Sequence, residues 1–159
     1  MYMFLPMLLN SANPLLNEKH VGILMNINNT SRQYGLTITA EDAKNIVEVR
    51  NTVLRNYGRV DLGIAATGEI MEKFCTSSFI NSGNYLYIIN EIQELFYYLK
   101  NETEEKIPDD ELITLLRELF ENYCWGSVEF LKGVVQEYAE AFRKQEQKRD
   151  ILEKGDAQH

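Results

Sequence analysis

Between Asn84 and Arg143 the apolar residues recur three and four positions apart, and this spacing constrains the fold more than any other feature of the sequence. It runs through three successive segments: Tyr85, Ile88, Ile92, Leu95 and Leu99; then Leu112, Leu116, Leu119 and Tyr123; then Val128, Leu131, Val135, Tyr138 and Phe142. Side chains at these intervals form one stripe along an α-helix and do not form one face of a β-strand. Three such stripes joined by short breaks predict antiparallel helices packed as a bundle.

The earlier part of the chain adds three predicted helices. They cover about residues 17–34, 40–57 and 64–78. Gly35 and Gly58 can end the first two because glycine readily adopts the left-handed conformation, and Thr39 with Asp42 can cap the second. Gly126 breaks the chain before the last stripe, which leaves either separate fifth and sixth helices or one long kinked helix. We therefore predict an all-α, single-domain, up-and-down helical bundle of five to six helices.

A single domain is expected to span residues 1–159, because no internal repeat or low-complexity linker divides the chain. Residues 1–14 are expected to form an N-terminal cap segment on the core or, as the alternative, a docking segment for a partner. Residues 146–159 are polar and charged, and we expect them to form a loose tail in which the last helix frays.

The charge of the chain bears on its partners and its location. A net charge of −8 argues against duplex DNA and anionic membranes, because both present negative surfaces. The apolar run from Met1 to Leu9 is too short to cross a membrane, and it lacks the basic region and cleavage site of a signal peptide. Cys75 and Cys124 have no CxxC spacing and suit buried thiols, although Cys124, just off its helix stripe and beside Trp125, leaves a reactive role open. We expect a cytoplasmic protein that binds no nucleic acid and no membrane.

Motifs for catalysis, metals and cofactors are incomplete in this sequence. Residues 63–68 match the glycines of a phosphate-binding loop, but Glu69 stands where the motif needs a lysine. His20 and His159 do not follow a glutamate by three positions, as the histidines of di-iron bundles do. No G-x-S-x-G nucleophile motif is present. We therefore expect no cofactor, no metal and no catalytic residue.

Arg50 interrupts the apolar face of the second predicted helix. At about 100° per residue it lies between Ile46 and Leu54, where an apolar side chain is expected. A buried guanidinium keeps its charge and needs a carboxylate or several carbonyl groups as partners. These partners can belong to the chain itself, to an anionic ligand or to an acidic partner protein. An anion pocket would use Arg50 together with Tyr57 and Arg59.

Three consecutive aromatic residues, Phe96, Tyr97 and Tyr98, cover three sides of the fourth predicted helix. At least one ring must then face solvent or another molecule. The apolar ring and polar hydroxyl of tyrosine suit an interface between subunits. These residues are therefore the candidate interface of a homodimer.

Several short segments resemble a family of uncharacterised bacterial proteins of similar length, the domain-of-unknown-function family numbered 6323. The likeness runs through Tyr34-Gly35-Leu36, residues 39–43, Arg50, residues 58–61 and Phe74-Cys75, and continues into residues 90–98 and 109–112. It covers about residues 33–142. The resemblance implies a single-domain bacterial protein and carries no known activity, cofactor or catalytic residue.

Function is therefore inferred from the helix faces alone. The leading hypothesis is a non-catalytic protein–protein interaction or assembly protein, with a homodimer as one form of assembly. The alternative is a helical protein that binds a small anionic ligand or metabolite through Arg50. The second alternative is an enzyme without a recognisable motif.

Overall fold

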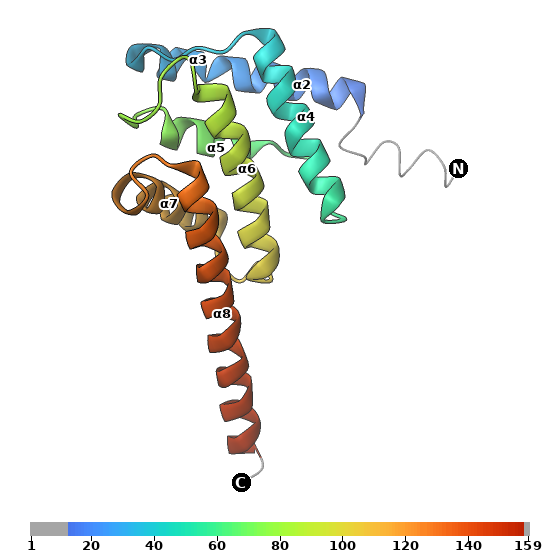
Figure 1. The fold of residues 1–159 in the computed structure, drawn as a ribbon. Coiled ribbons are helices and arrows are strands. Elements are labelled where there is room, and N and C mark those ends of the chain that lie inside the picture. Colours follow the sequence, from blue (N-terminus) through green and yellow to red (C-terminus); the bar gives the residue numbers. More distant parts are fainter. Residues whose placement is uncertain (1–12, 158–159) are drawn as a thin grey trace, which may run out of the picture.

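A computed structural model describes residues 13–157, and its regular structure within that range is entirely helical (Figure 1). The cap segment expected at residues 1–14 lies outside the described residues as far as residue 12. The elements are α2 (Pro14–Asn26), α3 (Asn28–Ser31), η1 (Arg32–Tyr34), α4 (Ala40–Asn56), α5 (Ala65–Phe74), α6 (Tyr85–Glu102), α7 (Asp109–Glu118), η2 (Leu119–Tyr123) and α8 (Val128–Ala157). The prediction of an all-α helical bundle is confirmed.

Helix α6 forms the centre of the bundle. It packs against α4, α5, α7 and α8, while α2 packs on α4 and α5 packs on α7. Because neighbours surround α6, its buried residues are not confined to one stripe: Ile89, Gln93, Phe96 and Tyr97 are buried in addition to the predicted stripe through Ile92 and Leu99. The core therefore extends around most of this helix.

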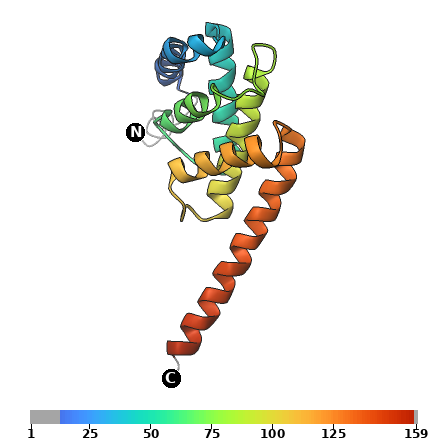
Figure 2. The ribbon, with the colours of Figure 1, turned by 90° about the vertical axis from the view of Figure 1, so that its left-hand side faces the viewer.

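The long helices do not alternate in direction. In two perpendicular views, α4, α6 and α8 run in the same general direction, and the shorter α5 and α7 run across them (Figures 1 and 2). Helices α5 and α7 have 10 residues each, or about 15 Å, whereas the 18 residues of α6 extend about 27 Å. A short crossing helix therefore connects each long helix to the next and replaces a full-length antiparallel neighbour.

The predicted helix ends follow the local chemistry. The Asp42 amide donates to Thr39 Oγ1 (3.1 Å), and the Thr39 amide donates to Asp42 Oδ2 (3.0 Å), which makes a complete capping box at the start of α4. Gly35 and Gly58 adopt positive φ angles of 79° and 64° after the first and second helical segments. The first segment is divided into α2, α3 and η1, with Ile27 at the junction.

Helix α8 corrects the prediction of a loose tail, because it continues to Ala157 over 30 residues (Figure 2). Polar residues such as lysine, glutamine and glutamate form helices readily, so the loss of an apolar stripe after Phe142 ends the packing and not the helix. Glu146 accepts a hydrogen bond from Lys106 (2.6 Å), and residues 147–155 are exposed. Within residues 13–157, no helix combines the length and the apolar character that a membrane span requires.

Candidate functional site

Arg50 is fully buried, as the position of this residue on α4 predicts. Its Nη2 donates to the main-chain carbonyl oxygens of Asp61 (2.6 Å) and Gly63, and its Nη1 donates to Asn51 Oδ1 (3.0 Å). Asn51 in turn donates to Asn17 Oδ1 (3.1 Å) on α2. The guanidinium therefore braces the loop between α4 and α5 through carbonyl groups of its own chain, which is one of the arrangements expected for a buried arginine.

Tyr57 and Arg59, the other two residues of the expected anion pocket, do not converge on Arg50. Arg59 forms an ion pair with Glu105, next to the start of α7. Tyr57 is half-buried and lines a groove between α4, α6 and α8. Arg50 does not line this groove. The structure therefore separates the three residues.

The candidate interface at Phe96, Tyr97 and Tyr98 also requires correction. Phe96 and Tyr97 are buried in the core, with 0% and 1% of their surface exposed. Their rings pack edge to face, with 4.9 Å between the ring centroids. Burial raises the pKa of Tyr97, and the positive charge of Arg50 opposes that rise. Only Tyr98, which is half-buried, reaches the surface. The neighbours that surround α6 enclose the two rings that a helix with one buried face would expose.

Four partly exposed aromatic side chains gather instead where α7 turns into α8, whereas Tyr34 and Tyr87 are exposed elsewhere. Helix α7 passes into one π-helical turn, in which the Cys124 amide donates to the Leu119 carbonyl (2.8 Å), five residues earlier. Trp125 and Gly126 follow with φ angles of 49° and 78°, and the Gly126 amide donates to the Phe120 carbonyl (2.8 Å). Two successive left-handed residues thus reverse the chain, and α7 and α8 are separate helices.

The ring of Phe79 packs against Gly126 in this turn. A Cβ atom at Gly126 would lie 2.5 Å from Phe79 Cγ, so only glycine fits both the space and the backbone angle. Phe79 in turn packs edge to face on the buried ring of Phe120, at 6.2 Å. Trp125 precedes this fixed glycine, and its side chain is 77% exposed.

Two further rings extend the surface beside the turn. Tyr123 and Phe130 stack nearly parallel, with 5.9 Å between ring centroids and 9° between planes, and they are 63% and 53% exposed. Phe79 is 38% exposed. We call Phe79, Tyr123, Trp125 and Phe130 the aromatic surface. It is the candidate functional site, because four partly exposed aromatic rings are grouped around one turn, and exposed apolar groups of this size mark binding surfaces.

Two glutamates next to residues of the aromatic surface, Glu121 and Glu129, have basic partners within the chain. Glu121 accepts from Arg117 (3.0 Å) and from Ser77 (2.9 Å). Glu129 forms an ion pair with Lys132 (3.5 Å). The edge of the aromatic surface therefore carries local charge of both signs.

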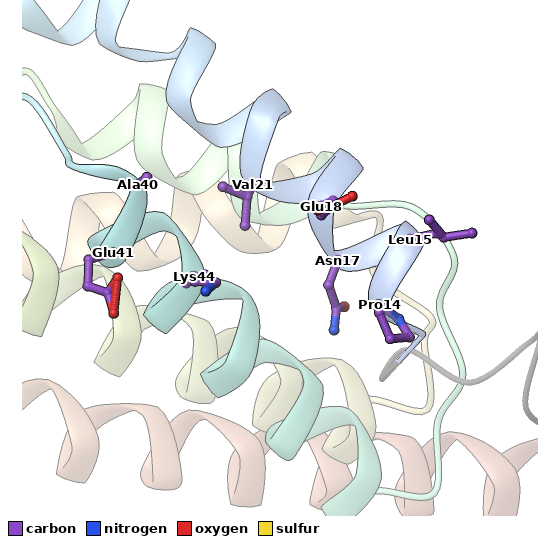
Figure 3. A pocket seen from close by; sticks show the side chains of 8 residues that line it. All are labelled: Pro14, Leu15, Asn17, Glu18, Val21, Ala40, Glu41 and Lys44. Atoms are coloured by element: carbon purple, nitrogen blue, oxygen red, sulfur yellow. The ribbon is translucent and has the colours of Figure 1, made fainter.

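A pocket of about 660 Å³ lies elsewhere, between α2 and α4 (Figure 3). Asn17 and Val21 point from α2 toward α4, whereas Leu15 points away. The pocket borders the point where the described chain begins, and it includes none of the site residues expected from the sequence. Across the described part of the chain, no three His, Cys, Asp or Glu side chains gather to form a metal site.

Comparison with known proteins identifies the family. Residues 23–148 match a family described as "Family of unknown function (DUF6323)". The chain belongs to this family. No curated protein matches the chain, and no solved structure matches it either.

In this member of the family, sequence periodicity misplaces the surface for an identifiable reason. The predicted stripe passes through Leu119 and Tyr123, but the buried positions are Phe120 and Cys124. A π-helical turn contains an extra residue and rotates all later side chains around the helix axis. Burial also raises the pKa of Cys124, which disfavours the reactive thiolate. In the sequence, only the adjacent pair Trp125-Gly126 indicates that the chain breaks near the exposed ring of Trp125.

Proposed function

We propose that this protein is a non-catalytic assembly protein that forms a homodimer through the aromatic surface. The observation that carries the proposal is Trp125, a bulky side chain in left-handed backbone with 77% of its surface exposed. Left-handed geometry costs roughly 1–2 kcal/mol for a residue with a side chain. An exposed ring recovers little of that cost within one chain. A second molecule that covers the ring would recover it.

The size of the aromatic surface fits a dimer contact. From the exposed fractions of its four side chains, it presents on the order of 500 Å² of mainly apolar area. A standard interface buries about 800 Å² on each partner, and somewhat more than half of that area is apolar. The aromatic surface can therefore form the centre of one standard interface.

The charges at its edge favour a second copy of the same chain as the partner. In a two-fold contact like surfaces meet, so unpaired carboxylates would face each other and repel. Here Glu121 and Glu129 already have basic partners in their own chain. Two copies can thus approach despite a net charge of −8 each.

Trp125 is the only tryptophan of the chain, so the tryptophan fluorescence of the protein depends on the environment of this side chain alone. We expect its fluorescence to shift to shorter wavelength as protein concentration rises, together with a light-scattering mass approaching twice 18.5 kDa. Trp125→Asn should abolish the doubling of mass and leave thermal stability unchanged or higher, because asparagine tolerates left-handed backbone.

Leu15→Asn is the matched control, since Leu15 is 78% exposed and lies on α2 outside the aromatic surface. This variant should dimerise as the wild type does. A wild-type mass that stays at one chain up to high micromolar concentration would refute the proposal. Equal loss of dimer in the control would also refute it.

A further inference from the structure

A second feature, independent of the aromatic surface, is the groove that contains Tyr57. It has a volume of about 210 Å³. Its lining residues come from three helices. They are Tyr57 at the end of α4, Glu94, Leu95 and Tyr98 on α6, and Lys132 and Gln136 on α8. We call this feature the Tyr57–Tyr98 groove.

The carboxylate of Glu94 is the available charge in this groove. Lys132 forms ion pairs with Glu91 (3.0 Å) and Glu129 (3.5 Å), so its positive charge is already balanced. Glu94 has no hydrogen-bond or ion-pair partner among the described residues. Partial burial raises the pKa of Glu94, Glu91 raises it further, and Lys132 opposes the rise.

The two tyrosines add apolar ring surface beside this carboxylate. Burial raises the pKa of Tyr57 and of Tyr98, Glu102 raises both further, and Arg143 opposes the rise at Tyr98. Glu102 is paired with Arg143, so Glu94 supplies the uncompensated charge that a ligand would meet in the groove. The groove is therefore suited to a positive ligand, whereas the sequence predicts an anionic one for Tyr57.

We propose that the Tyr57–Tyr98 groove binds a small alkylammonium group. Glu94 would pair with the ammonium, and the rings of Tyr57 and Tyr98 would contact its alkyl carbons and positive charge. A groove of this volume is smaller than the usual 300–1,000 Å³ of ligand pockets, so it suits one amine group and a short chain. Both a free amine and a lysine side chain of another protein present this chemistry.

The test is an NMR titration of the whole protein with n-butylammonium chloride. We expect saturable shifts of amides around the groove with a dissociation constant in the millimolar range, and no such shifts with sodium butyrate. Glu94→Gln should weaken binding about tenfold. Glu48→Gln removes another exposed carboxylate, on α4 outside the groove, and should leave binding unchanged.

A parallel titration with lysine blocked at both main-chain ends separates the two sources. Tighter binding of the blocked lysine would assign the groove to a partner's side chain, and tighter binding of butylammonium would assign it to a free amine. The proposal fails if butyrate shifts the same amides equally. It also fails if the shifts do not saturate, or if Glu94→Gln binds as the wild type does.

Discussion

The carbonyl groups of Asp61 and Gly63 cannot bond within a helix, because α5 begins only at Ala65. Arg50 supplies the hydrogen bonds to them from the interior. Helical periodicity is sufficient to predict that Arg50 is buried. It does not predict the partners, because they belong to an irregular loop whose path depends on tertiary packing.

We predict that Arg50→Met destabilises the fold by about 3 kcal/mol, because two partly buried carbonyl groups lose a charged donor. For a chain of this length, that corresponds to a fall in melting temperature of roughly 6–12 °C. Circular dichroism melts would measure it. Arg55→Met on the exposed side of α4 is the control and should melt within about 2 °C of the wild type. Equal melting temperatures for the two variants would contradict a bracing role for Arg50.

His20 predicts a pH dependence of stability. Its Nε2 donates to the Leu62 carbonyl (3.0 Å), and Nδ1 is buried without a partner among the described residues. Burial lowers the pKa of His20 below 6.5, and the hydrogen bond to Leu62 opposes that effect. Above about pH 6.5 His20 is neutral in both the folded and the unfolded chain, and its contribution to the free energy of unfolding is complete. As the pH falls through the lowered pKa, the unfolded chain gains the proton first, so the free energy of unfolding decreases.

Urea unfolding of the wild type and of His20→Gln between pH 7.5 and pH 5 would measure this effect. Glutamine cannot titrate, so the difference in unfolding free energy between the two proteins should shrink as the pH falls. A difference that stays constant over this range would show that His20 has an ordinary pKa.

At the scale of whole elements, the 3–4 spacing of apolar residues identifies the helices well. It identifies the buried face of a helix only where each turn keeps 3.6 residues. The stripes of α6 and of the first half of α8 are buried as expected at Ile92, Leu99, Leu131 and Val135. The π-helical turn after α7 breaks that regularity and exposes Tyr123. Since nothing in the residue types of this turn marks the extra residue, the aromatic surface could not be located from the spacing.

The turn between α7 and α8 predicts a strong effect of Gly126→Ala. The new Cβ would meet the ring of Phe79 and would also occupy left-handed backbone. Together these effects should cost about 3 kcal/mol in unfolding free energy. Gly133→Ala, in open space within α8, should be neutral or stabilising because alanine favours helices. Chemical denaturation curves would compare them, and a Gly126→Ala variant as stable as Gly133→Ala would contradict this account of the turn.

At the scale of the whole molecule, the charge of −8 opposes self-association, whereas the proposed contact through the aromatic surface would favour it. Salt weakens the repulsion between two acidic chains and leaves apolar burial largely intact. We predict that raising sodium chloride from about 0.05 M to about 0.5 M tightens the proposed dimer several-fold. Sedimentation velocity at several concentrations would measure the change. Weaker association at high salt would indicate an interface that depends on ion pairs.

The protruding end of α8 has a hydrodynamic consequence. Beyond Glu146, eleven helical residues extend about 16 Å from the body of the molecule (Figure 2). Such a particle has more friction than a sphere of the same mass. A single chain would therefore leave a size-exclusion column early and imitate a larger species, so only a measurement independent of shape can count its subunits.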